Sequence, residues 1–440
     1  MAMFEIREKP QKVERALLVR IYFDRREEEE AEKLLLELKE LVTTLGIGVE
    51  DILLVNARKM QAKFLCGTGK AAEVVEFAEA HECDCIVFDN MLAPHQQRSW
   101  EELAGVTVID REEVILDIFA DRAQTREATL QVELARMQYA LPRMARMWAH
   151  LDRQGGSGGG ATSRGEGEKQ IEVDRRLARA KIDSVKRELE LVRKQRATQR
   201  KTRETTEIAH AAIVGYTNAG KSTLLNQLTG DAILAKDMLF ATLDTTTRKI
   251  DLPDGQPLLI TDTVGFIRNL PHRLVEAFKS TLEEAVLADF LIQVLDVTDP
   301  EAMQYYQTTC EVLQELGAED KEMIVALNKC DALEDELELK AFESQFEKSV
   351  RISAKAGIGM DDLLNLCTLE LVDKVKILEY KIPQFRGDLV SLLHSHAKVD
   401  STEYEGNDVL IKAIVPAAIE GKVREFQLNA EPVKKEAWEK

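Results

Sequence analysis

Residues 215–222 constrain the fold of this chain more than any other feature. They read GYTNAGKS and fit the pattern GxxxxGK(S/T) in full. The apolar run 211–215 (AAIVG) before them predicts a strand, and the residues from 223 to 228 after them predict a helix. In that context the backbone N–H groups turn inward around a phosphate, and the helix N-terminus adds a favourable dipole. We therefore predict an α/β domain with a polyphosphate-binding loop.

Two side chains of this loop carry specific chemistry. Lys221 supplies positive charge to the β- and γ-phosphates, and the Ser222 hydroxyl is typical of a Mg²⁺ ligand. The residues expected to contact the nucleotide here are Gly215, Tyr216, Thr217, Asn218, Ala219, Gly220, Lys221, Ser222 and Thr223. The loop alone does not identify the base.

A second motif, NKxD, points to guanine. Its residues follow the apolar run 323–327 and are Asn328, Lys329, Cys330 and Asp331. The Asp331 carboxylate can accept from both N1–H and N2–H₂ of guanine. Adenine lacks that pair of donors and would leave a buried Asp331 unpaired. The sequence therefore predicts GTP and GDP as ligands.

Three further segments complete the expected site. A DxxG motif follows the strand-like run 257–261, and it supplies an Asp near Mg²⁺ and a Gly N–H for the γ-phosphate. Its residues are Asp262, Thr263, Val264 and Gly265. The segment where a first switch is expected contains Phe240, Ala241, Thr242, Leu243 and Asp244. The last guanine-contact loop is expected at Ser353, Ala354 and Lys355.

Thr242 is our choice for the second hydroxyl ligand to Mg²⁺ beside Ser222. On residue type alone, three neighbouring threonines compete for that role: Thr245, Thr246 and Thr247. We assign the catalytic contacts to Lys221, Thr242 and Gly265.

The position after DxxG lacks a catalytic group. Ras-like enzymes have a water-orienting Gln there, whereas this chain has Phe266, whose ring cannot orient water. We therefore expect slow intrinsic hydrolysis, with the remaining groups supplied by an activator, a repositioned residue or a monovalent cation. Asn218 is placed to help hold K⁺ beside the phosphates.

Charge is unevenly distributed along the chain. The formal net charge is −19, yet residues 141–203 contain 17 Lys/Arg and 8 Asp/Glu. The whole chain is therefore not a typical nucleic-acid binder, but this one segment is a candidate contact surface for phosphates.

No run approaches the roughly 18 apolar residues of a membrane span. The N-terminus lacks a secretory core, and the six scattered cysteines fit reduced thiols in a cytoplasmic protein.

The order of predicted elements defines four domains. Strands near 16–23, 52–56, 85–89 and 106–109, with a helix at 27–45, predict an α/β domain at 1–115 with a mostly parallel sheet. One long helix over 111–151, interrupted by Pro142, and a second over 169–203 flank a Gly-rich loop near 154–168. They predict an antiparallel hairpin at 116–206. The GTPase domain is expected at 207–374. A small α+β domain is expected at 375–440, with a helix at 387–397 and strands near 409–415 and 423–428.

The motifs together resemble the HflX family of GTPases. The matching residues are GYTNAGKST (215–223), FATLD (240–244), DTVGFIRNLPH (262–272), NKCD (328–331) and SAK (353–355), with 117–135 and 164–176 upstream. The resemblance implies a ribosome-binding GTPase that contacts the 50S subunit and 70S ribosome through the hairpin, and splits stalled ribosomes under stress such as heat. Two departures are Thr245, where the family commonly has Pro, and a longer Gly-rich loop.

Two other functions remain open at this stage. A ribosome-assembly or RNA-binding GTPase would predict an RNA-binding tail, and residues 378–440 have neither a GxxG clamp nor RNP-type aromatic stretches. A nucleotide-regulated interaction protein with little turnover is compatible with Phe266. We expect a monomer that binds no DNA; peripheral membrane association is left open.

Overall fold

The computed structural model describes residues 13–144, 173–192, 194, 208–230, 239–240, 243–271, 274, 282–333, 336–371 and 375–428. The chain packs into two compact units. The first comprises 1–195, 236–244 and 268–281, and the second comprises 196–235, 245–267 and 282–440. Two short segments from the middle of the chain thus belong to the first unit.

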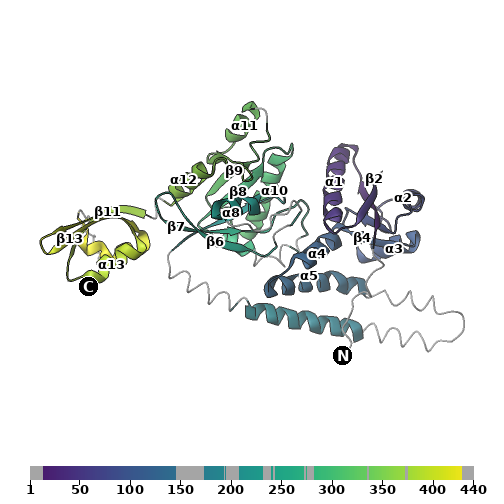
Figure 1. Ribbon diagram of the computed structural model, residues 1–440. Coiled ribbons are helices and arrows are strands. Elements are labelled where there is room, and N and C mark those ends of the chain that lie inside the picture. The colour runs from purple at the N-terminus through teal and green to yellow at the C-terminus, as the bar shows by residue number, and fades with distance from the viewer. Residues whose placement is uncertain are drawn as a thin grey trace, which may run out of the picture. The chain divides into compact units, whose positions relative to one another are not determined.

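The first unit contains a four-stranded sheet of order β2-β1-β3-β4 in which every pairing is parallel. Figure 1 shows this sheet with its helices. The elements are β1 (Arg15–Tyr22), α1 (Glu28–Thr44), β2 (Gly48–Asn56), α2 (Thr68–Ala80), β3 (Cys85–Phe88), α3 (Pro94–Ala104), β4 (Thr107–Asp110), α4 (Arg111–Arg122) and α5 (Arg126–Met144). The prediction of a mostly parallel α/β domain is confirmed.

Side-chain periodicity explains how this sheet is covered. Leu17, Val19 and Ile21 alternate along β1 and share one core with residues of α2 and α3. Figure 1 shows α1 on the other side of the sheet, and its buried residues include Leu34 and Leu38, one helical turn apart. Both faces are therefore buried, as is usual for a parallel sheet.

The prediction of one helix over residues 111–151 is wrong. Two helices occur, because α4 ends at Arg122 and α5 begins at Arg126. The Thr125 hydroxyl accepts from the Ala128 N–H at 3.2 Å, which is an N-terminal cap and starts a new helix. Pro142 lies inside α5 and does not end it. The predicted residues beyond Met144 lie outside the described part of the chain.

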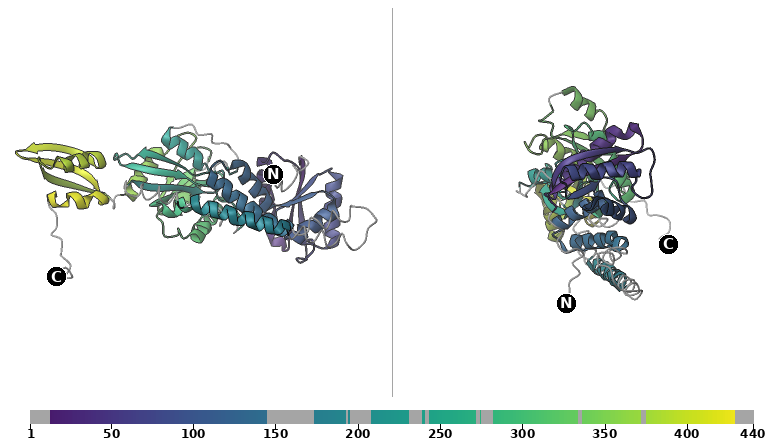
Figure 2. Two further views of the ribbon diagram at one scale, coloured as in Figure 1. Left: turned by 90° about the horizontal axis from the view of Figure 1, so that it is seen from below. Right: turned by 90° about the vertical axis from the view of Figure 1, so that its right-hand side faces the viewer.

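The predicted antiparallel pairing of helices is confirmed. Residues 173–192 are helical and lie alongside α5 in Figures 1 and 2. Arg126 of α5 makes an ion pair with Glu188, and Glu133, later in α5, pairs with Lys181, earlier in the second helix. The two helices are therefore antiparallel. Their shared core consists of Leu130, Leu134, Ile182, Val185 and Leu189. The Gly-rich loop near 154–168 lies outside the described residues.

The second unit contains a six-stranded sheet of order β10-β9-β8-β5-β7-β6. All pairings are parallel except β6 with β7. The elements are β5 (Ala209–Gly215), α8 (Lys221–Thr229), β6 (Thr246–Asp251), β7 (Pro257–Asp262), β8 (Phe290–Asp296), α10 (Ala302–Leu316), β9 (Met323–Asn328), α11 (Glu336–Glu343), β10 (Ser349–Arg351) and α12 (Met360–Glu370). The predicted α/β fold of this region is confirmed.

A three-stranded antiparallel sheet of order β11-β13-β12 follows. Its elements are β11 (Val375–Pro383), α13 (Gly387–His396), β12 (Lys398–Glu405), β13 (Asp408–Pro416) and α14 (Ala417–Val423). Figure 2 shows the two helices on one face of the sheet. The predicted strand near 423–428 is wrong, since a 3₁₀ helix occupies Arg424–Phe426. Among the helices that the structure describes, none has the length and apolar character to span a membrane.

Candidate nucleotide-binding site

The predicted motifs meet at one edge of the six-stranded sheet. Gly215 ends β5, Asp262 ends β7 and Asn328 ends β9. The carboxyl ends of parallel strands lie at the same edge, where α/β sheets bind their ligands. Sheet topology alone therefore places three sequence motifs in a common site.

The phosphate loop has a conformation that only glycine permits at its tight turn. Gly220 has φ +101°, and a Cβ at this position would collide with the Asn328 side-chain amide. The loop then enters α8 at Lys221. The backbone N–H groups at the start of α8 are thus available for a phosphate.

Lys221 is a buried cation at the centre of the loop. Its Nζ donates to the Tyr216 carbonyl at 2.6 Å. Burial lowers the pKa of Lys221 to about 8, and the Asp262 carboxylate opposes this shift. A Cβ on Gly265 would come within 2.9 Å of the Lys221 ammonium. The Lys221 ammonium and Gly265 therefore lie next to each other. This is the arrangement that both would need in order to contact one γ-phosphate.

Ser222 and Asp262 supply adjacent oxygen atoms. The Ser222 Oγ donates to Asp262 Oδ2 at 2.6 Å, and Asp262 is only 2% exposed. Hard oxygen ligands of this kind suit Mg²⁺, which usually binds one or two protein oxygens together with phosphate and water. The residues present fit a magnesium ion.

Asn328 organises the guanine-contact loops. Its Nδ2 donates to the Ala219 carbonyl at 2.7 Å, and its Oδ1 accepts from the Ala354 N–H at 2.9 Å. One side chain thus joins the phosphate loop, NKxD and the Ser353–Lys355 loop. Lys329 makes an ion pair with Asp296 at 2.5 Å.

Asp331 and Lys355 are exposed. The expectation that the Asp331 carboxylate is buried is therefore wrong for this structure. Discrimination between guanine and adenine would then arise only when the bound base itself covers the carboxylate.

Two residues of this site had not been predicted. Asp296 pairs with Lys329 and lies at the end of β8, so its position after an apolar run was a usable signal. Tyr305 stacks on the ring of Tyr216, with centroids 3.9 Å apart and an interplanar angle of 11°. Tyr305 stands beside a second tyrosine, Tyr306, and no local pattern shows which of the two would stack on Tyr216.

Phe266 is part of the protein core. It is 1% exposed, and its backbone pairs with the phosphate loop through Thr217 N–H to Phe266 O at 2.8 Å and Phe266 N–H to Gly215 O at 3.1 Å. The backbone of Phe266 therefore stabilises the loop, while its buried ring has no access to a water-orienting position.

The first-switch segment makes contacts within the first unit. The ring of Phe240 packs edge-on against Phe119 of α4, and the Asp244 carboxylate binds the N-terminus of α5. Ala241 and Thr242 lie outside the described residues. Of the threonines that compete with Thr242, Thr247 shares a hydrogen bond of 2.8 Å with Thr261.

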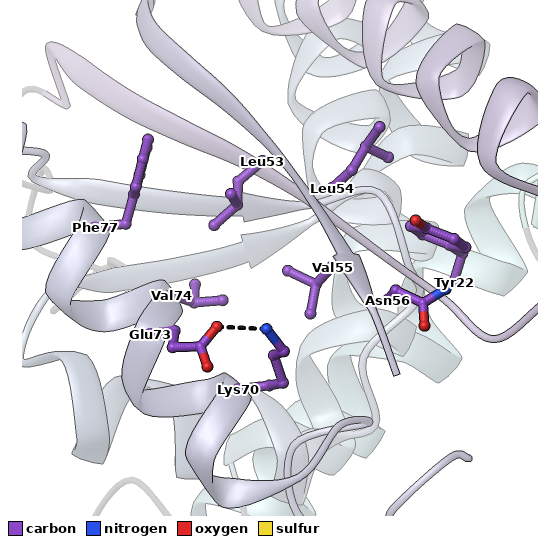
Figure 3. Close-up of a pocket in the computed structure, with 9 residues that line it drawn as sticks. All are labelled: Tyr22, Leu53, Leu54, Val55, Asn56, Lys70, Glu73, Val74 and Phe77. Atoms are coloured by element: carbon purple, nitrogen blue, oxygen red, sulfur yellow. Dashed lines mark hydrogen bonds and ion pairs between the residues drawn. The ribbon is translucent and has the colours of Figure 1, made fainter. Parts of the chain in front are cut away.

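A separate pocket occurs in the first unit (Figure 3), with a volume of about 460 Å³. Lys70 in its wall makes a 2.6 Å ion pair with Glu73. The lining residues are Tyr22, Leu53, Leu54, Val55, Asn56, Lys70, Glu73, Val74 and Phe77. None of the predicted nucleotide-contact residues belongs to it.

Comparison with known proteins agrees with this geometry. Three family models match the chain: "GTP-binding GTPase N-terminal" over residues 32–120, "GTP-binding GTPase Middle Region" over 122–203, and "50S ribosome-binding GTPase" over 210–329. The fold and the site define a P-loop GTPase that binds GTP and GDP.

Individual relatives show to which family of GTPases the chain belongs. GTPase HflX of Akkermansia muciniphila is 62% identical over 433 residues, covering 96% of this chain and 99% of that protein. GTPase HflX of Lacrimispora saccharolytica is 42% identical over 417 residues, covering 95% and 97%. A solved structure titled "crystal structure of SsGBP and GDP complex" is 26% identical, covers 82% of this chain and 99% of that chain, and has a TM-score of 0.46. The chain belongs to the HflX family of GTPases.

Proposed function

We propose that this GTPase binds the 50S ribosomal subunit and, with GTP bound, separates stalled 70S ribosomes into subunits under stress such as heat. The family description "50S ribosome-binding GTPase" over residues 210–329 supports ribosome binding. The protein would act in the cytoplasm as a monomer and would bind no DNA.

The observation that carries this proposal is the basic surface of helix 173–192. Arg175, Arg176 and Arg179 are exposed there. The same helix is held against α5 by a shared apolar core, so it presents its charges on a supported surface. Clustered arginines on a rigid helix suit contact with the phosphate backbone of rRNA.

Nucleotide binding would use the residues at the sheet edge. Lys221 and the N–H groups of the phosphate loop would hold the β- and γ-phosphates, and Asp331 would bind guanine. Ser222 and Asp262 would hold Mg²⁺ together with Thr242, and Asn218 would help to hold K⁺. Bound Mg²⁺ neutralises phosphate charge during transfer to water.

The deciding experiment measures GTP turnover by the purified full-length protein with and without 50S subunits, in K⁺ and in Na⁺ buffer. We expect strong stimulation by 50S subunits, because Phe266 leaves the intrinsic site without a water-orienting side chain. Higher turnover in K⁺ would support the cation role of Asn218. Turnover unaffected by ribosomes would contradict the proposal and favour a nucleotide-regulated interaction protein.

Charge reversal of Arg175, Arg176 and Arg179 to Glu should weaken 50S binding and flatten its dependence on salt. Each lost phosphate contact should reduce the slope of log K against log salt by about one. Sedimentation with 50S subunits at several KCl concentrations measures both effects.

The matched control for this experiment makes the same change in net charge on the C-terminal domain. It reverses the exposed residues Lys412, Lys422 and Arg424. If both triple variants lose affinity equally, helix 173–192 has no specific role in binding.

A further inference from the structure

The side chain of Thr217, in the phosphate loop, contains a buried polar atom without a hydrogen-bond partner among the described residues. Thr217 is 6% exposed, and the unpaired atom is its hydroxyl oxygen. The backbone N–H of the same residue is satisfied, since it donates to the Phe266 carbonyl at 2.8 Å. The loop is therefore held through the backbone of Thr217, and the hydroxyl takes no part in holding it.

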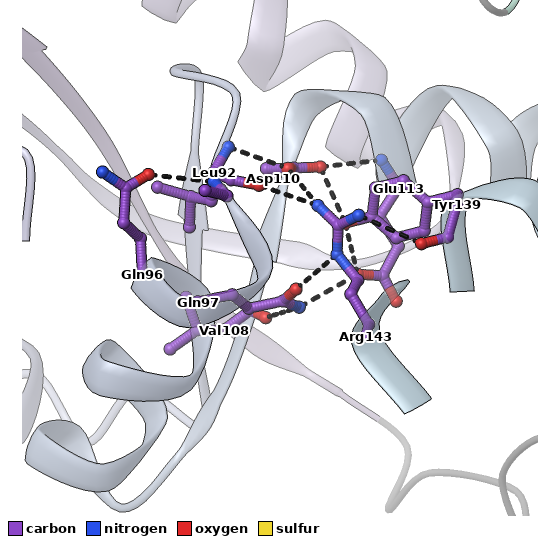
Figure 4. Close-up of polar contacts among 9 residues, drawn as sticks. Leu92, Gln96, Gln97, Val108, Asp110, Glu113, Tyr139 and Arg143 are labelled. Carbon is purple, nitrogen blue, oxygen red and sulfur yellow. Dashed lines mark hydrogen bonds and ion pairs between the residues drawn. The ribbon is translucent and has the colours of Figure 1, made fainter. Parts of the chain in front are cut away.

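A buried polar group normally has a partner, because an unpaired one costs stability. Figure 4 shows a paired example in the first unit, where the buried Asp110 accepts from the Tyr139 hydroxyl at 3.0 Å and the Arg143 guanidinium at 3.3 Å. A valine at position 217 would have the shape of threonine without the unpaired hydroxyl. The Thr217 hydroxyl thus contributes nothing to the stability of this fold that a methyl group would not supply.

The neighbours of Thr217 indicate which ligand its hydroxyl would contact. A Cβ on Gly265 would lie 2.8 Å from Thr217 Cγ2 and 2.9 Å from the Lys221 ammonium. Lys221 and Gly265 are the two groups expected to contact the γ-phosphate. DxxG loops move when a γ-phosphate binds. Movement of Gly265 away from Thr217 would uncover the threonine side chain beside that phosphate.

The backbone pairing that buries Phe266 also fixes the position of Thr217. Phe266 donates to the Gly215 carbonyl at 3.1 Å and accepts from the Thr217 N–H, so the two chain segments lie side by side. Phe266 occupies the position where a water-orienting glutamine is expected in Ras-like enzymes. Its ring is buried and cannot take that role. Thr217, on the adjoining segment, offers a hydroxyl in its place.

We propose that Thr217 is a catalytic residue whose hydroxyl orients the attacking water. A hydroxyl can accept a hydrogen bond from this water while it donates one to a γ-phosphate oxygen. The water oxygen bonds to the γ-phosphorus, the bond from this phosphorus to the β–γ bridging oxygen breaks, and GDP leaves with the electron pair. A proton of the water passes to the released phosphate. The hydroxyl therefore only has to position the water, as is usual for catalysis of phosphoryl transfer.

The proposal rests on the expected contacts of Lys221 and Gly265 with the γ-phosphate, and it does not involve the ribosome. All the residues that carry it belong to the second unit. An error in the phosphate contacts would be recognised separately, because Lys221→Ala would then bind GTP normally.

The test compares Thr217→Val with Thr217→Ser in the full-length protein without ribosomes. The rate of GTP hydrolysis is measured in a single turnover with protein in excess, and GDP affinity by titration with fluorescent GDP. Thr217→Val should slow hydrolysis by about ten-fold or more, the usual effect of losing one hydrogen bond to a charged group. Its GDP affinity should stay within about two-fold of the unsubstituted protein, because GDP lacks the γ-phosphate. Thr217→Ser keeps the hydroxyl and should recover most of the rate.

Thr309→Val is the matched control. Thr309 is fully buried in α10, and its hydroxyl donates to the Tyr305 carbonyl of its own helix at 2.9 Å. Its hydrolysis rate should stay within about two-fold of that of the unsubstituted protein.

Melting temperature without nucleotide distinguishes a catalytic hydroxyl from a structural one. Thr217→Val loses an unpaired buried hydroxyl, so its melting temperature should equal or exceed that of the unsubstituted protein. A clear fall would assign the hydroxyl to holding the loop and would overturn the proposal. So would a Thr217→Val hydrolysis rate within about two-fold of the unsubstituted protein, or a Thr217→Ser rate as low as that of Thr217→Val.

Discussion

Replacement of Lys221 by alanine is expected to abolish tight binding of Mg·GTP. The ammonium would contact two phosphate groups, and each hydrogen bond between charged partners contributes about 1.5–3 kcal/mol. The loss should therefore be at least about a hundred-fold in affinity, measured by titration with a fluorescent GTP analogue. The exposed Lys249 on β6 gives a control, since Lys249→Ala removes a cation of the same kind outside the loop.

Lys221→Ala should weaken nucleotide binding without lowering the thermal stability of the nucleotide-free protein. Lys221 is buried, and burial lowers its pKa to about 8, so the nucleotide-free protein gains little from this charge. We expect the melting temperature of the nucleotide-free variant to equal or exceed that of the unsubstituted protein. Added GDP should raise the melting temperature of the unsubstituted protein only. A large fall in melting temperature without nucleotide would show that Lys221 holds the loop together, which would contradict this expectation.

Asp331→Asn should transfer selectivity from guanine to xanthine nucleotides. The carboxylate offers two acceptors to the guanine N1–H and N2–H₂ groups, whereas an amide offers one acceptor and one donor. The amide donor would face the guanine amino group but would pair with the xanthine 2-oxo group. We expect GTP affinity to fall by about a hundred-fold or more, because the hydrogen bond from the guanine amino group is lost and that donor is left facing the amide N–H. Competition between GDP and XDP for a fluorescent nucleotide measures this change.

Asp331 is also a favourable position for this test. Its side chain is exposed, so the substitution should leave the fold and the melting temperature of the nucleotide-free protein unchanged. Phosphate contacts remain as an internal control, since XDP binding requires the same Lys221. Unchanged preference for guanine would show that another group reads the base.

The nucleotide site was predictable because each of its motifs is local. GxxxxGK(S/T), DxxG and NKxD each combine a strand end with a short polar loop, and a parallel sheet brings those ends together without further information. Asp296 also lies at the end of a strand, after an apolar run, but it was not predicted. The stacking of Tyr305 on Tyr216 depends on how α10 packs, and no local pattern encodes it.

The errors in the predicted elements have physical causes as well. Residues 111–151 have a uniformly helix-favouring composition, and the local cap at Thr125 was not recognised. A second acceptor at the start of this helix is Asp244, 119 positions after Thr125. Such a distant cap is invisible in a local window. The segment 423–428 is short and mixed, and a run of this length does not distinguish strand from helix by periodicity.

The membership of residues 236–244 and 268–281 in the first unit affects how this protein can be dissected. A truncation that begins at residue 207 follows chain order, but it removes Phe119 and thereby uncovers the ring of Phe240, which is 2% exposed in the intact protein. An aromatic side chain deprived of its partner repacks or promotes association. The isolated GTPase segment should therefore have a different conformation around Phe240. We expect its kinetics to differ from those of the whole chain.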